Sequence, residues 1–151
     1  MPNATLAADV SQEYLGGGYV IGQSIAGEMV KTGIDPWAVA EQVYETQSAN
    51  RLRLLGRVLD SLEIAGGGKV AAVATRKRDL AEFSATKDHL EGFINYPRSI
   101  VGVEVAVSFR EEGDREYRVN FRSKGRVDVS AVALSFGGGG HRNAAGCTVR
   151  G

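Results

Sequence analysis

The sequence predicts an α+β domain, a mixed β-sheet flanked by helices, with linker helices on its N-terminal side. Apolar residues recur at helical spacing through residues 21–62, whereas residues 103–122 alternate between apolar and polar side chains. After residue 67, short apolar runs, a hairpin signal and short helical segments are interspersed, as in α+β domains. The chain has 151 residues, 43% of them apolar, which is enough to bury a core in one domain.

The N-terminal part of the sequence predicts helices and no strands. Residues 1–20 show no periodic pattern, and we expect a tail there that is either disordered or appended. Residues 21–66 are expected to be linker helices. The first would end at Gly33, and the second would start at Asp35-Pro36, where Asp is the N-cap and Pro the first helical residue.

A third helix is predicted from about Ser48 to Leu62, because its leucines and Val58 form a wide apolar stripe. Gly66–Gly68 is expected to be a hinge before the sheet domain, residues 67–151. A short apolar run over residues 70–74 predicts a buried strand immediately after the hinge.

The remaining elements follow from patterning and turn residues. They are, in chain order, helices at 79–84 and 86–96 with Pro97 ending the second, a hairpin of strands 103–109 and 117–122 around a turn at 112–114, a helix at about 128–135 after Asp128, and a last strand at 146–149.

Composition excludes several classes of protein. The 18 basic and 18 acidic residues give a net charge of zero, which argues against a domain that binds bulk polyanions. No apolar run approaches the roughly 20 residues of a membrane span. The N-terminus does not resemble a secretory signal, and the single cysteine, Cys147, cannot form an internal disulfide, so we expect a cytoplasmic protein and a packed thiol.

Charge is nevertheless unevenly distributed along the chain. Residues 115–151 carry seven basic and two acidic side chains, which indicates a local site for an anion. Arg118, Asn120, Arg122 and Lys124 lie at alternate positions of a predicted strand and share one face. Taken alone, such a face is more often the solvated side of an edge strand than a ligand site.

The strongest candidate for a site is the glycine run Gly137, Gly138, Gly139 and Gly140, followed by His141 and by the small residues Ala144 to Gly146. Consecutive glycines cost conformational entropy, and their amides can form a concave nest for an anion. The alternative is a flexible loop. The basic strand nearby favours the ligand interpretation, with Arg122 and Lys124 contacting phosphate. Asn95 and Arg98 are weaker candidates, because Arg98 is equally compatible with pointing into water.

The sequence does not match other common catalytic or ligand-binding motifs. Gly68-Lys69 lacks the Ser or Thr and the upstream glycine of a phosphate-binding loop. His89 is expected on the exposed side of the 86–96 helix, and His141 has no Asp, Glu or Cys at ligand spacing, so we predict neither a metal site nor a catalytic residue in this chain.

The motif GGGGHxxAAG at residues 137–146 resembles the signature of the DHH-associated C-terminal domain of DHH-family phosphoesterases. Asn120 to Lys124 resemble the family's strand before this motif, and Val127 to Ser130 resemble the start of its short helix. Arg51 to Leu62 and Glu91 to Tyr96 resemble the oligoribonuclease and phosphoadenosine-phosphate phosphatase branch, which is related to RecJ-like exonucleases and cyclic-dinucleotide phosphodiesterases. The similarity covers roughly residues 21–151.

The resemblance implies a role as the substrate-binding half of a phosphoesterase that hydrolyses short oligoribonucleotides, dinucleotides or 3′,5′-bisphosphonucleosides. It implies that manganese or another divalent metal is held by an N-terminal DHH catalytic domain, which would be the partner of this chain. The sequence contains no DHH motif, since its one Asp-His pair, Asp88-His89, is followed by leucine. We therefore expect the chain alone to be inactive.

Two alternatives from other classes remain open. A related glycine-histidine domain ends alanyl-tRNA synthetases, which suggests a stand-alone nucleic-acid-binding module. A homodimerisation module is the other, with the leucine stripe of residues 48–62 pairing two chains. The sequence does not specify the substrate, the direction of degradation or the oligomeric state.

Overall fold

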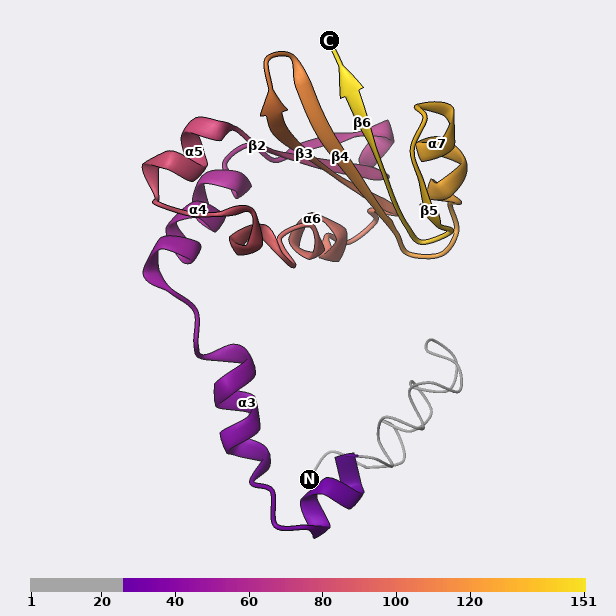
Figure 1. The fold of residues 1–151 in the computed structure, drawn as a ribbon. Coiled ribbons are helices and arrows are strands. Elements are labelled where there is room, and N and C mark those ends of the chain that lie inside the picture. The colour runs from indigo at the N-terminus through magenta and orange to yellow at the C-terminus, as the bar shows by residue number, and fades with distance from the viewer. Residues whose placement is uncertain (1–25) are drawn as a thin grey trace. The chain divides into compact units, whose positions relative to one another are not determined.

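The computed structural model describes residues 26–151, which fall into two compact units that meet at Gln47 and Ser48 (Figure 1). Expectations that concern residues 1–25, including the tail, lie outside the described residues. No helix in the described range has the length and apolar character needed to cross a membrane.

The first unit is helical in its described part. A helical segment at 26–31 is followed by α3 (Pro36–Tyr44). The side chain of Asp35 accepts a hydrogen bond from the Trp37 backbone N–H at 2.9 Å, so the predicted cap and start of this helix are confirmed.

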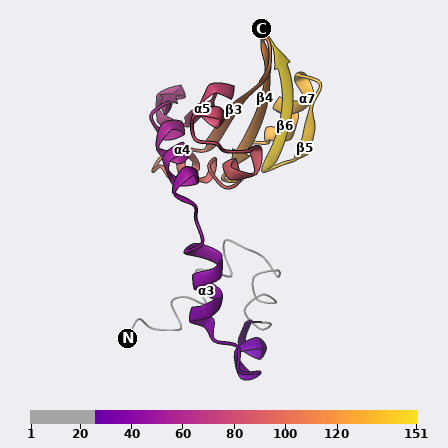
Figure 2. The ribbon, with the colours of Figure 1, turned by 60° about the vertical axis from the view of Figure 1, so that its left-hand side comes forward.

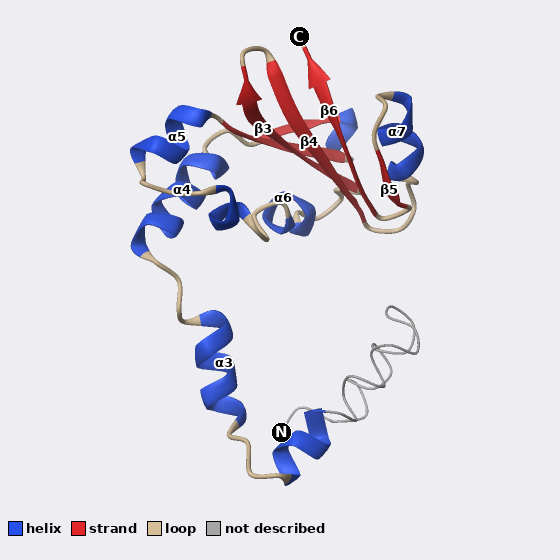
Figure 3. Cartoon of the chain, in the orientation of Figure 1, coloured by secondary structure: helices blue, strands red, loops and turns tan. Residues whose placement is uncertain are grey.

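The second unit contains a six-stranded sheet in the order β1-β2-β3-β4-β6-β5 (Figure 3). Its elements are α4 (Ala49–Leu59), β1 (Glu63–Ala65), the 3₁₀ turn η1 (Gly66–Gly68), β2 (Val70–Thr75), α5 (Lys77–Glu82), the 3₁₀ turn η2 (Lys87–Leu90), α6 (Asn95–Ser99), β3 (Val105–Gly113), β4 (Glu116–Ser123), α7 (Val129–Ser135), β5 (Gly139–His141) and β6 (Ala144–Arg150). Strands β2 and β3 are parallel and the other pairs antiparallel, which confirms the predicted α+β class with a mixed sheet.

The sheet carries a different core on each face. On one face, Leu54, Leu55 and Val58 of α4 pack with Val73 of β2 and with Phe93. On the other face, α7 packs against apolar residues of the central strands (Figure 2). Because strand side chains alternate, residues of even number in β4 lie on the α4 face and those of odd number on the α7 face.

Helices α4 and α7 both begin at a side-chain cap. Ser48 accepts from the Arg51 N–H at 3.2 Å and starts α4. Asp128 accepts from the Ser130 N–H at 3.0 Å and starts α7, as the sequence predicts. Hydrogen bonds from the Ser130 side chain and backbone lower the pKa of Asp128 and keep this cap ionised.

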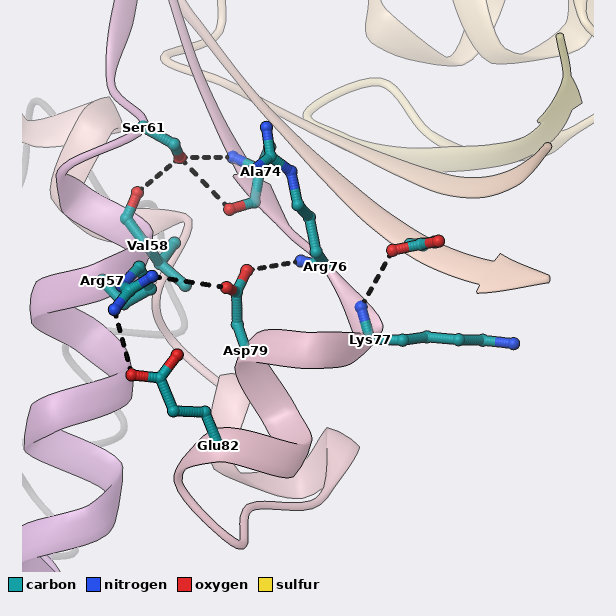
Figure 4. A network of polar contacts seen from close by, with 9 residues as sticks. Arg57, Val58, Ser61, Ala74, Arg76, Lys77, Asp79 and Glu82 are labelled. Carbon is teal, nitrogen blue, oxygen red and sulfur yellow. Dashed lines mark hydrogen bonds and ion pairs between the residues drawn. The ribbon is translucent and has the colours of Figure 1, made fainter. Parts of the chain in front are cut away.

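A polar network joins α4, β2 and α5 beside the first core (Figure 4). The Ser61 hydroxyl accepts from the Ala74 N–H at 2.8 Å, tying the end of α4 to β2. The buried carboxylate of Asp79 accepts from the Arg76 N–H at 2.8 Å and lies 4.0 Å from the Arg57 guanidinium. The network therefore fixes the start of α5 against α4.

The structure corrects four sequence expectations. Gly66–Gly68 is a tight turn with positive φ at each glycine, joining β1 to β2 as antiparallel neighbours, and is not a hinge. Residues 86–96 do not form one helix, because Gly92 has φ +80° and separates η2 from α6. Pro97 lies inside α6, where a first-turn residue needs no N–H partner. Residues 139–141 were expected to be part of a loop, whereas they form strand β5, which pairs with β6.

Substitution of a core residue in α4 tests this packing. Leu54 is 0% exposed, so Leu54→Ala should lower the free energy of unfolding by about 2–5 kcal/mol through lost burial and a residual cavity. Leu52, on the same helix, is 53% exposed, and Leu52→Ala should change it by less than about 1 kcal/mol. Urea unfolding of both variants makes the comparison, and equal effects would contradict this orientation of α4.

Candidate functional site

The sheet register brings the predicted arginine and histidine to one face. Arg122 of β4 lies opposite Ala144 of β6, and Ala144 lies opposite His141 of β5. Residues directly opposed across strands share a face, so Arg122 and His141 are on the same side of the sheet with one methyl group between them. Two inter-strand steps separate their backbones by roughly 10 Å.

The next set of directly opposed residues along β4, β6 and β5 has even smaller side chains. It runs from Asn120 through Gly146 to Gly139. A Cβ atom at Gly146 would lie 3.1 Å from the Asn120 Oδ1 and 3.2 Å from an Arg118 guanidinium nitrogen, so both polar side chains reach over this glycine. The result is a shallow surface of glycine and alanine, bordered by polar groups of β4 and by His141.

The glycine run has a structural reason as well as a possible role in binding. A Cβ atom at Gly138 would lie 2.2 Å from the Gly146 carbonyl oxygen, and one at Gly140 would lie 2.5 Å from the Ala145 Cα. Side-chain-free backbone is thus required for β5 to approach β6. Gly139 differs, because a Cβ atom there would have no atom within 4 Å.

Two amides of the run already have partners inside the domain. The Gly137 N–H donates to the Leu134 carbonyl at 3.0 Å, and the Gly138 N–H donates to the Ala133 carbonyl at 2.8 Å. Gly137 has φ +71°, the usual conformation of a residue that closes a helix C-terminus. These two glycines end α7, so their amides are not free donors for an anion.

A cleft of about 400 Å³ lies on the same face, between the strands and residues 87–94. Polar lining groups come from β2, β3 and β4: Thr75, Ser108, Arg110, Asn120 and Arg122. The acidic side chains of Asp88 and Glu91 also line it. Among the described site candidates, Arg122 is the one that belongs to this lining.

Electrostatics single out Arg122 within the cleft. Lys87 and Arg110, the other lining cations, both bind the Glu112 carboxylate, Lys87 at 2.5 Å. The hydrogen bond from Lys87, then that from Arg110, holds the pKa of Glu112 below its usual value, so this carboxylate is ionised and is shared by the two cations. Arg122 donates to the Phe121 carbonyl at 3.0 Å and has no ion pair within residues 26–151.

The other predicted residues, Lys124, Asn95 and Arg98, do not line the cleft. Lys124, just beyond β4, is exposed, and its Nζ donates to the Ile100 carbonyl at 3.0 Å. Asn95 and Arg98 belong to α6, which packs against β2, β3 and β4, and Arg98 is half-buried. Neither of these two is among the lining residues of the cleft described above.

Sequence reasoning missed Thr75, Ser108 and Arg110 as neighbours of Arg122. The alternation of the 103–109 strand already placed Ser108 and Arg110 on one face. It could not show that β3 lies between β2 and β4, with Ser108 opposite Asn120 and Arg110 opposite Arg118. No group of three or more His, Cys, Asp or Glu side chains within the described range is placed to hold a metal ion.

Comparison with known proteins adds a family relationship. The DHHA1 domain profile matches residues 67–151. The bifunctional oligoribonuclease and PAP phosphatase NrnA of Bacillus subtilis is 32% identical over 124 residues, which cover 82% of this chain and 38% of that protein. Its Thermus thermophilus counterpart is 30% identical over 129 residues, covering 84% of this chain and 37% of that protein.

A solved structure agrees with the fold. An exopolyphosphatase-related protein from Bacteroides fragilis matches with a TM-score of 0.77 and 33% identity, over 85% of this chain and 38% of that one. The chain therefore spans less than half the length of these relatives.

Substitution of neighbouring glycines separates the packing role from open surface. Gly138→Ala should lower the free energy of unfolding by about 1–3 kcal/mol, because the methyl group would overlap β6 backbone. Gly139→Ala should leave it within about 0.5 kcal/mol of the original protein. Thermal or urea unfolding reports both, and equal stability of the two variants would show that β5 does not approach β6 this closely.

The Glu112 carboxylate predicts a pH-dependent contribution to stability. At pH 7, Glu112→Gln should lower the free energy of unfolding by about 0.5–1 kcal/mol, the range of partly exposed ion pairs. Since the pKa of Glu112 is lowered in the folded state, the contribution is full above the ordinary value of 4.5 and is lost as pH falls through the lower folded value. Urea unfolding of both proteins from pH 7 to pH 3 should show the difference shrinking, and a constant or growing difference would contradict this assignment.

Proposed function

The chain belongs to the DHHA1 domain family, and we propose that it is the substrate-binding part of a DHH-family phosphoesterase that acts on short oligoribonucleotides, dinucleotides or 3′,5′-bisphosphonucleosides. Its relatives are named for oligoribonuclease and PAP phosphatase activity, and the substrates in both names are phosphate esters that can present a phosphate end group. In this proposal the chain holds that phosphate end.

The observation that carries the proposal is the row of Arg122, Ala144 and His141. A guanidinium without an ion pair in the described residues can donate two parallel hydrogen bonds to a phosphate. The exposed imidazole of His141 supplies a further donor from the other side of the alanine. The small floor admits an anion close to the backbone, and open space at Gly139 adds to it.

Neighbouring groups would extend the site in two directions. The adjoining cleft offers hydroxyl and amide groups of Thr75, Ser108 and Asn120, which suit the sugar or base of a nucleotide. Lys124 and, from α6, Asn95 and Arg98 would add polar contacts around the phosphate. Exchanging the Ile100 carbonyl for a phosphate oxygen would let Lys124 act as a point charge.

Hydrolysis itself is assigned to a DHH domain that would be the partner of this chain. DHH-family phosphoesterases use divalent metal, expected to be manganese, to activate water. The residues of the described range do not fit such a centre, as no cluster of three ligands occurs among them. No step of the reaction is therefore assigned to this chain beyond binding and orienting the substrate.

The proposal predicts a specific loss of ligand binding. Arg122→Ala should weaken the binding of adenosine 3′,5′-bisphosphate by at least tenfold, since hydrogen bonds to charged groups contribute about 1.5–3 kcal/mol each. Arg53→Ala, which removes an exposed arginine of α4, is the matched control and should bind as the original chain does. Isothermal titration calorimetry of the full chain measures both, and unchanged affinity in Arg122→Ala would refute this role.

A further inference from the structure

Two aromatic side chains lie exposed on the α7 face of the sheet, the face opposite the Arg122 site. Phe109 of β3 is 38% exposed and Tyr117 of β4 is 39% exposed. Phe109 is paired with Val119, and Tyr117 with Glu111, so the two rings are diagonal neighbours on one face, about 7–8 Å apart at their backbones. We call this pair the aromatic platform.

The aromatic platform forms the floor of a concave surface of about 540 Å³. Ala74 of β2 and Val149 of β6 flank the two rings, so the floor spans four strands. Helix α7 packs over β4, β5 and β6, yet none of its residues is among the lining of this surface. The rings are therefore accessible where the central strands extend past the second core.

One cation at the rim, Arg76, has no partner for its guanidinium within residues 26–151. Arg76 lines the surface, and its guanidinium makes no ion pair or hydrogen bond among the described residues. Two nearby carboxylates, those of Asp79 and Glu111, already accept hydrogen bonds. Asp79 accepts from the Arg76 backbone N–H and faces Arg57, and Glu111, which also lines the surface, accepts from the Lys77 N–H at 3.0 Å (Figure 4).

We propose that the aromatic platform binds consecutive bases of single-stranded nucleic acid, with Arg76 contacting the backbone phosphate between or beside them. Exposed aromatic rings on adjacent strands stack on any base, and an unpaired guanidinium beside them complements the phosphate charge. This site goes beyond the proposed function, because it lies on the other face of the sheet and would hold a strand rather than its terminal phosphate.

A second copy of the chain is the competing occupant. An isologous contact could bring Arg76 of one copy to Glu111 of the other. The two partly exposed rings beside Arg76, whose guanidinium is unpaired among the described residues, favour nucleic acid, and Glu111 already accepts one hydrogen bond, from the Lys77 N–H.

Binding of a fluorescein-labelled ten-nucleotide oligouridylate to the full chain tests the platform. Phe109→Leu and Tyr117→Leu should each weaken binding by roughly tenfold, the usual effect of removing one stacking ring. Arg76→Gln should make the slope of log affinity against log salt concentration shallower, by about the amount that one phosphate contact contributes. Tyr44→Leu, which removes an exposed tyrosine of α3, and Arg53→Gln are the matched controls and should bind normally.

A second measurement, of tryptophan fluorescence, keeps an aromatic ring at position 109. Phe109→Trp, made together with Trp37→Phe to remove the sole native tryptophan, should show fluorescence quenched by oligouridylate and by single-stranded oligothymidylate but not by duplex RNA. Absence of quenching, or unchanged affinity of both leucine variants, would overturn the proposal. Self-association of the chain that these same substitutions abolish would overturn it in favour of the second copy.

The test is separable from that of the proposed function. Tyr117→Leu should bind adenosine 3′,5′-bisphosphate as the original chain does, because Tyr117 does not line the cleft beside Arg122. Arg122→Ala should still bind oligouridylate through the platform. If Arg122→Ala binds bisphosphate normally while the leucine variants lose oligouridylate, the phosphate-end site fails and the aromatic platform stands.

Discussion

The close approach of β5 to β6 is the constraint on which the candidate site depends. Only residues without side chains fit at positions 138 and 140, since a Cβ atom at either would overlap the β6 backbone. This contact sets the register that places His141 opposite Ala144 and hence on the face of Arg122. A shift of one residue would turn the histidine to the α7 face, because side chains alternate along a strand.

The two faces of the sheet have different surroundings for a physical reason. The α4 face is covered by apolar residues over β2 and left polar over β4, β6 and β5, so a cleft and a small-residue floor remain. The α7 face is apolar along most of the central strands and buries Cys147, as the sequence predicts. Helix α7 covers only part of that face, and the aromatic platform lies beyond it.

The sequence predicted correctly those elements that have a long periodic pattern. It did not predict elements and neighbours that depend on tertiary contacts. The stripe of α4 and the alternation of β3 and β4 predicted those elements, and alternation placed Arg122 and Asn120 together. Strand β5 was missed because three residues rich in glycine carry no strand preference, and its pairing with β6 alone makes it a strand. The break in residues 86–96 depends on a positive φ at Gly92, which the helical pattern hides. Spacing could not reveal that β3 lies between β2 and β4, so Thr75, Ser108 and Arg110 escaped notice.

The central claim is that a phosphate end group lies on the row formed by Arg122, Ala144 and His141. A titration of the ¹⁵N-labelled chain with adenosine 3′,5′-bisphosphate, followed by NMR spectroscopy of backbone amides and of the arginine Nε and histidine ring nitrogens, tests it most directly. The structure predicts saturable shifts at Arg122, His141 and Gly139, with little change at the aromatic platform. Shifts confined to other surfaces, with these three residues unmoved at saturation, would contradict it.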